Sequence, residues 1–253
     1  MSGLTYLTKT QKSTLQPVVG IIALCIVTLF SNLAFADEPI KITISNTFDD
    51  VVFDGKWSFP YEWKASSLDK FRFHDNDLIL RSAHQDNNLY IMINVLGDIT
   101  YDHIADRAIL CLDGGDISKK ADETDWCYVA KRGSKNGTTL NGGSPIYRTS
   151  NFSIEKNHPD FIAVGGTSAE TDRYLKTPHA VYEFQIPIEQ IGFEDEYGFF
   201  IQVFDGKNVM TYPTEHSGKS PQMIPSPEKW GLLISPDHSI TSEHFNQNSK
   251  GMN

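Results

Sequence analysis

The sequence is poor in cysteine and lacks the usual motifs of catalytic and covalent cofactor sites. Only Cys25, Cys111 and Cys127 occur among 253 residues, and no Cys-x-x-Cys-His is present, which excludes covalent attachment of a c-type haem. The motifs G-x-S-x-G and H-E-x-x-H are absent too, and the eight histidines lack the spacing of metal ligands. We therefore predict a protein that is not an enzyme.

No helical period persists over three turns, and no internal repeat is found. Short apolar or alternating segments separated by turn residues occur instead, which is typical of strands. The candidate strands are residues 40–45, 78–80, 89–95, 108–112, 126–130, 161–164, 180–186, 197–204 and 230–234. Residues 187–192 form at most one helical turn. The pattern predicts an all-β fold, an antiparallel β-sandwich of the jelly-roll or immunoglobulin-like kind.

Residues 133–151 are rich in Gly, Ser, Asn and Thr, and strand-like segments continue beyond them. We interpret this stretch as a long surface excursion rather than a linker between domains. It holds two N-x-[ST] sequons, at Asn136 and Asn151. These are predicted glycosylation sites in a host that modifies exported proteins, and chance occurrence in an Asn-rich loop is the alternative.

The only long apolar run lies near the N-terminus. Lys9 and Lys12 precede an uncharged run from Pro17 to Phe30, and Ala34 and Ala36 form an A-x-A site. Residues 1–36 are therefore predicted to be a signal peptide cleaved after Ala36. An uncleaved anchor is the alternative, because the 20 residues from Pro17 to Ala36 could just span a bilayer.

Basic residues are scarce in the remainder of the chain. Residues 37–253 carry 20 basic and 32 acidic side chains, a net charge of −12, which does not favour binding to nucleic acid or anionic lipid. Membrane contact is expected only through an uncleaved N-terminal segment. We predict a single β-sandwich domain over residues 37–235, a polar tail over 236–253, and a secreted or extracytoplasmic location.

The stretch from Asp106 to Arg132 is predicted to be a hairpin with an acidic loop. If Cys111 lies opposite Cys127 in an antiparallel pair, Asp113 lies opposite Asp125 at the mouth of the loop. An even cysteine pair in an exported chain favours a disulfide, which would contribute on the order of 3 kcal/mol. Two buried free thiols are the alternative.

The acidic loop is the strongest chemical feature of the sequence. Calcium prefers six to eight oxygen ligands, and five side chains could supply several of them: Asp113, Asp116, Asp122, Glu123 and Asp125. The spacing does not match an EF-hand loop, however, and Lys119 and Lys120 partly neutralise the segment. A calcium site and a solvated acidic loop both remain open.

Several segments between about residues 54 and 234 form a recognisable series: DGKW with EWKASSL, NLYIMINVLGD, AILCLDGGD with DETDWCYV, YEFQIPIEQIG, YGFFIQVFD and SPEKWGLL. Together they resemble the family 9 carbohydrate-binding modules and their wider DOMON-like relatives. The resemblance implies an antiparallel β-sandwich, often calcium-loaded, that binds sugars in one branch and haem in another. In the sugar-binding branch two aromatic rings hold a saccharide.

For a sugar site we select Trp57, with Tyr61 as its aromatic companion, because both lie in a polar, Pro-interrupted segment. Trp63 and Trp230 lie in the segments that carry the structural resemblance and are expected to fill the core. The predicted function is an exported, non-catalytic carbohydrate-binding protein that recognises a saccharide or the end of a polysaccharide.

Two alternatives to sugar binding remain open: a haem-binding electron-transfer domain and a structural cell-surface protein. Haem needs axial ligands, and the candidates are Met92, His74, His103, Lys176, Met210, His216 and Met223. No pair among them can be matched from the sequence.

Overall fold

A computed structural model describes residues 37–45, 51–58, 62–73, 76–102, 105–115, 120–144, 151–218 and 223–235. The predicted signal peptide, the polar tail, Tyr61 and Asp116 lie outside these ranges. No helix in the described ranges is long and apolar enough to cross a membrane.

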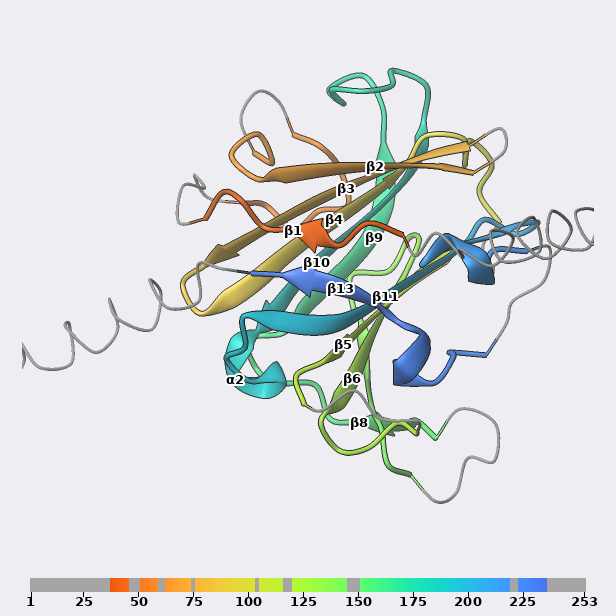
Figure 1. The fold of residues 1–253 in the computed structure, drawn as a ribbon. Coiled ribbons are helices and arrows are strands. Elements are labelled where there is room, and N and C mark those ends of the chain that lie inside the picture. The colour runs from red at the N-terminus through yellow and green to blue at the C-terminus, as the bar shows by residue number, and fades with distance from the viewer. Residues whose placement is uncertain are drawn as a thin grey trace, which may run out of the picture. The chain divides into compact units, whose positions relative to one another are not determined.

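One layer of the fold is a five-stranded antiparallel sheet (Figure 1). In spatial order its strands are β2 (Ser67–Phe73), β3 (Asn76–Gln85), β4 (Asn88–Val95), β10 (His179–Pro187) and β9 (Ile162–Ser168). Asp86 and Asn87 connect β3 to β4 with φ angles of 49° and 66°. Both are left-handed, as the tight turn of a two-residue hairpin requires, and Asp and Asn tolerate this conformation better than most residues.

The second layer is an eight-stranded sheet (Figure 1). Its order is β1 (Ile40–Lys41), β13 (Gly231–Ile234), β11 (Glu196–Phe204), β5 (Arg107–Asp113), β6 (Asp125–Lys131), β7 (Thr138–Asn141) and β8 (Ser153–Glu155), and β12 (Val209–Tyr212) also pairs with β11. All these pairs are antiparallel except that of β1 with β13. The two sheets confirm the predicted β-sandwich.

The main core lies between the sheets and receives alternate residues of each central strand. In β4, for example, Leu89, Ile91, Ile93 and Val95 belong to this core. Their neighbours Tyr90, Met92 and Asn94 therefore point to the outer face of the five-stranded sheet. The alternation leaves that outer face to more polar side chains, and the candidate site is built on it.

The structure also adds strands that sequence reasoning missed. The predicted surface excursion contains β7, and β2, β8 and β12 fall in segments without a strong apolar pattern. The strand predicted over 40–45 is shorter, since only Ile40–Lys41 pairs with β13. The single helical turn predicted over 187–192 is confirmed as α2 (Ile188–Ile191), and two short 3-10 turns, η1 (Thr214–His216) and η2 (Pro227–Lys229), lie beside β12 and β13.

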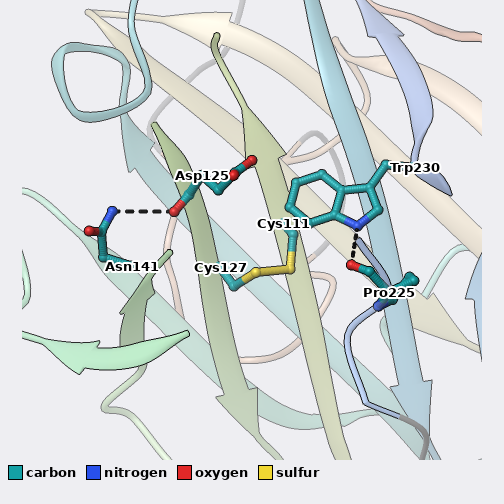
Figure 2. The surroundings of a disulfide bond; sticks show 6 residues. All are labelled: Cys111, Asp125, Cys127, Asn141, Pro225 and Trp230. Carbon is teal, nitrogen blue, oxygen red and sulfur yellow. Dashed lines mark hydrogen bonds between the residues drawn. A yellow bond between two sulfur atoms is a disulfide. The ribbon is translucent and has the colours of Figure 1, made fainter. Parts of the chain in front are cut away.

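The predicted hairpin is confirmed in its register. Cys111 pairs with Cys127, and Asp113 pairs with Asp125. A disulfide joins the two cysteines, with an S–S distance of 2.02 Å (Figure 2). It lies in a small apolar cluster on the outer face of the eight-stranded sheet, where Trp230 packs near it and donates a hydrogen bond to the Pro225 carbonyl at 3.0 Å.

Candidate ligand-binding site

The candidate site lies on the outer face of the five-stranded sheet. A buried cluster there consists of Trp57, Trp63, Met92 and Val181, with Tyr174 packed against it. The two tryptophans come from the segment before β2, whereas Met92 and Val181 come from the centre of the sheet. Residues 51–58 and 62–66 therefore cover this face, and the polar contacts that hold them decide the shape of the site.

Glu183 of β10 anchors the covering segment from beneath. Its side chain is 0% exposed and accepts hydrogen bonds from the Gly55 main-chain nitrogen at 2.7 Å and from Trp63 Nε1 at 3.0 Å. Burial raises the pKa of Glu183 well above its usual value, against the lowering effect of these two bonds. Gly55 has φ +75°, and a Cβ there would lie 2.5 Å from Gly166 Cα, so only glycine permits this close approach.

Asp172, in the connection between β9 and β10, organises the other side of the site. It accepts hydrogen bonds from Asn94 Nδ2 at 2.9 Å and from the Tyr174 main-chain nitrogen at 2.7 Å. His179 Nε2 lies 3.4 Å from its Oδ2 atom. Burial alone would raise the pKa of Asp172, but the bonds from His179, Tyr174 and Ser168 together lower it. The carboxylate is thus held ionised next to His179.

The same network fixes the main chain of Trp57. Ser168 Oγ accepts a hydrogen bond from the Trp57 main-chain nitrogen at 3.1 Å, and the Thr171 hydroxyl donates to the Trp57 carbonyl at 2.8 Å. Both contacts span more than 100 residues of sequence. The position of Trp57 therefore depends on β9 and on the loop that follows it.

Arg81 of β3 lies between two aromatic rings. Its guanidinium carbon is 5.6 Å from the centre of the Trp57 ring and 5.8 Å from that of Tyr174. Its Nε donates to the Tyr174 hydroxyl at 2.9 Å, and its Nη1 donates to the Ser66 carbonyl at 3.0 Å. The Nη2 atom also donates to the Tyr174 hydroxyl. Arg81 is 5% exposed, so these groups hold a nearly buried cation.

Tyr174 is the aromatic residue of this cluster that Arg81 orients and that reaches solvent. It is half-buried, and Lys70 of β2, which is exposed, places its Nζ 5.9 Å from the ring centre. The Trp57 ring meets it edge-on at 5.6 Å. The arrangement offers a half-exposed ring with amine and guanidinium groups beside it.

The structure describes only one of the two residues that were selected from the sequence for a sugar site. Trp57 is 1% exposed, so it is a buried ring beside Arg81 and not a solvent-facing platform, and Tyr61 lies outside the described residues. Trp63 and Trp230 are buried as expected, at 0% and 8% exposure. Tyr174 was missed, although it too lies in a polar segment that contains a proline, TDRYLKTP.

The acidic loop brings together fewer carboxylates than its sequence suggests. Asp122 Oδ1 accepts hydrogen bonds from the main chain and hydroxyl of Thr124, and Glu123 is exposed. Asp113 Oδ1 accepts from Gly115 N at 2.8 Å, and Asp125 Oδ2 accepts from Asp122 N at 2.6 Å. Burial, with the charges of Asp113 and Asp122, raises the pKa of Asp125 to about 7.

These acids do not by themselves fit a calcium ion, which needs six to eight oxygens. In the described part of the chain, no three or more Asp, Glu, His or Cys side chains are grouped so that they could hold a metal. Asp116, the fifth predicted ligand, lies outside that part. Calcium at this loop stays a prediction.

A second buried ionic cluster has a structural explanation. Arg132 Nη1 lies 3.2 Å from Asp98 Oδ1 and 3.2 Å from Asp106 Oδ2, and all three side chains are buried. Burial and the charge of Asp106 raise the pKa of Asp98 to about 7. The cluster ties the end of β6 to the connection between β4 and β5, and its cation has two carboxylate partners.

The candidate haem ligands lie in unrelated surroundings. Met92 belongs to the outer-face cluster, whereas Met210 belongs to the core between the sheets. Lys176 Nζ donates a hydrogen bond to the Asp172 main-chain carbonyl, and His216 Nε2 lies 3.3 Å from Glu215 Oε1. Met223 is exposed. His74 and His103 lie outside the described residues. None of the contacts described for these ranges joins two of the candidates.

Comparisons with known proteins give a structural similarity and no sequence match. No family model and no curated protein matches the chain. The structure is similar to a family 9 carbohydrate-binding module from Caldicellulosiruptor kristjanssonii in complex with cellotriose, with 13% identity, 78% of this chain and 93% of that chain covered, and a TM-score of 0.46. It is also similar to a family 9 module from the same organism in complex with glucose. In that comparison the sequence identity is 14%, 76% of this chain and 94% of that chain are covered, and the TM-score is 0.44. The assignment as a β-sandwich rests on the sheets and core described above.

Proposed function

We propose that the protein is an exported, non-catalytic carbohydrate-binding protein and that Tyr174 provides the aromatic surface of its site. The half-exposed Tyr174 ring, fixed by Arg81, is the observation that carries the proposal. The apolar face of a pyranose stacks on an aromatic ring while its hydroxyls bind nearby polar groups. The motifs that resemble family 9 carbohydrate-binding modules point to the same function.

Rigidity of the ring supports this role. Arg81 donates two hydrogen bonds to the Tyr174 hydroxyl, and Asp172 accepts one from the Tyr174 main-chain nitrogen. A ring held in this way loses little conformational freedom when a ligand binds, so more of the stacking energy contributes to affinity. Export is supported by the disulfide, which is typical of oxidising compartments, and by the signal sequence predicted for residues 1–36.

A glycan array, followed by affinity measurements on bound glycans, tests the proposal. Tyr174→Ala is expected to weaken binding roughly 10-fold or more through loss of ring stacking. Phe193→Ala is the matched control, because Phe193 is an exposed aromatic just after α2. No binding to any glycan of a broad panel, or equal affinities of Tyr174→Ala and the unmodified protein, would reject the proposed site.

A further inference from the structure

Arg81 is a buried cation whose charge has no partner among the described residues. None of the ion pairs in the described ranges includes it, so no described carboxylate lies within 4.0 Å of its nitrogens. Its hydrogen bonds go to neutral oxygens, the Tyr174 hydroxyl and the Ser66 carbonyl. Arg132, the other arginine that is buried in the described ranges, is by contrast paired with both Asp98 and Asp106.

The two aromatic rings beside Arg81 compensate only part of the cost of burying its charge. Each cation–π contact recovers a small share of the hydration that a guanidinium loses on burial, and hydrogen bonds to neutral acceptors recover another share. Buried charges in proteins are as a rule paired with an opposite charge. Arg81 is therefore prepared for an anion that none of the described residues supplies.

Two lysines lie near Arg81 and Tyr174, although the chain as a whole is acidic. Lys70 Nζ lies over the Tyr174 ring, and Lys176 Nζ binds the Asp172 main-chain carbonyl. Two carboxylates nearby are already engaged. Asp172 faces His179 and Asn94, and Glu183 binds Gly55 and Trp63. Neither makes an ion pair with Arg81, and Arg81 and Lys70 both lie beside the half-buried Tyr174 ring.

We propose that the site selects an acidic saccharide, one that carries a carboxylate or a sulfate group. The sugar ring stacks on Tyr174, and its anionic group lies near Lys70 and the Tyr174 hydroxyl, with the charge of Arg81 directly behind. That hydroxyl accepts both of its protein hydrogen bonds from Arg81, so its own O–H is available to donate to the anion. The inference rests on the proposed function, because it names the class of saccharide for the same site.

Calorimetric titration with size-matched tetrasaccharides tests the inference: cellotetraose as the neutral probe, tetragalacturonate as the carboxylate and a sulfated tetrasaccharide as the sulfate. At least one acidic probe is expected to bind about tenfold more tightly than the neutral one, as one charge-assisted hydrogen bond provides. Raising the salt concentration to about 0.5 M is expected to reduce this preference. The comparison of the two acidic probes identifies the anionic group.

Two variants with a matched control locate the preference. Lys70→Gln removes an exposed charge and is expected to weaken binding of the acidic probe about threefold. Arg81→Met is expected to remove the preference for acid while binding of the neutral probe persists, and its thermal melting confirms that it is folded. The control is Lys131→Gln, at the end of β6 in the other sheet. It is expected to leave the affinities for the acidic and the neutral probe unchanged.

The outcomes separate this inference from the proposed function. Equal affinity for neutral and acidic probes overturns the acidic preference and leaves saccharide binding intact. An acidic preference that survives both Lys70→Gln and Arg81→Met also overturns it, because the anion would then be bound elsewhere. Failure of every saccharide to bind rejects the proposed function, and the inference with it.

Discussion

Replacing Asp125 by asparagine is predicted to stabilise the protein at neutral and alkaline pH. Asp125 is fully buried, and Asp113 lies directly opposite it in the β5–β6 pair. Asparagine keeps the shape of the side chain and an oxygen for the Asp122 main-chain donor, which lies 2.6 Å from Asp125 Oδ2. It carries no charge, and its amide can donate a hydrogen bond to Asp113. The substitution therefore removes the repulsion without leaving a cavity.

The pKa of Asp125 sets the size and the pH range of this effect. Burial and the two neighbouring acids raise this pKa from 3.8 to about 7. Because the folded pKa exceeds the unfolded one, ionisation disfavours folding, and the penalty is complete above pH 7 and absent below about pH 4. It is at most about 4 kcal/mol, and we expect about 2 kcal/mol after relaxation and solvent screening.

Urea unfolding from pH 4 to pH 8 measures the effect. The difference in unfolding free energy between Asp125→Asn and the unmodified protein is expected to rise from near zero at pH 4 to about 2 kcal/mol at pH 8. Glu123→Gln is the control, since it removes one charge from an exposed site in the same loop. A variant less stable than the unmodified protein at pH 8 would refute the reasoning and show that ionised Asp125 is held by a favourable partner.

The same variant tests the predicted calcium site. If a cation lies between Asp113 and Asp125, chelator lowers the melting temperature of the unmodified protein, and Asp125→Asn abolishes this response. If the loop is merely solvated, chelator changes neither protein. The response to chelator distinguishes a cation bound between the two carboxylates from a proton shared by them, because only the bound cation is removed by chelator.

Four further outcomes are expected. Cys111→Ala combined with Cys127→Val should lower the free energy of unfolding by about 3 kcal/mol, because the disulfide closes a loop with a sequence separation of 16; an unchanged urea midpoint would contradict this. N-terminal sequencing of secreted protein should begin at Asp37, whereas an intact N-terminus would indicate the uncleaved anchor. A visible spectrum of purified protein should lack haem bands, and stoichiometric haem would revive the electron-transfer alternative. When a glycosylating host produces the protein, its intact mass should include attached glycan, and replacing Asn136 and Asn151 with glutamine should remove that added mass. A mass without glycan would show that both sequons are chance occurrences.

Much of the fold was predictable because its central strands have strong patterns. The apolar run over residues 89–95 predicted β4, whose alternate residues Leu89, Ile91 and Ile93 fill the main core. The hairpin register followed from one assumption, that Cys111 faces Cys127, since each residue of an antiparallel pair then has a fixed partner. Two of the strands that were missed, β2 and β8, lie at the edges of their sheets, where pairing and not side-chain pattern decides the structure.

The site was less predictable because its contacts join distant segments. Trp57 was selected because of its polar neighbours, but it is 1% exposed and contacts Arg81 and Ser168, which belong to the strands β3 and β9. Tyr174 has similar neighbours and stays half-exposed. Local composition cannot separate these two cases, since burial here depends on which loop covers the outer face. The acidic loop shows the same limit, because its sequence does not reveal that Asp122 and Asp125 accept hydrogen bonds from main-chain groups.

Saccharide binding at Tyr174 is the central claim, and a side-by-side glycan titration of three proteins tests it most directly. The unmodified protein and Phe193→Ala are predicted to bind the same glycan with equal affinity, and Tyr174→Ala to bind it roughly 10-fold more weakly or not at all. Equal binding by all three proteins would place the ligand elsewhere on the molecule. No binding by the unmodified protein would contradict the carbohydrate-binding function itself.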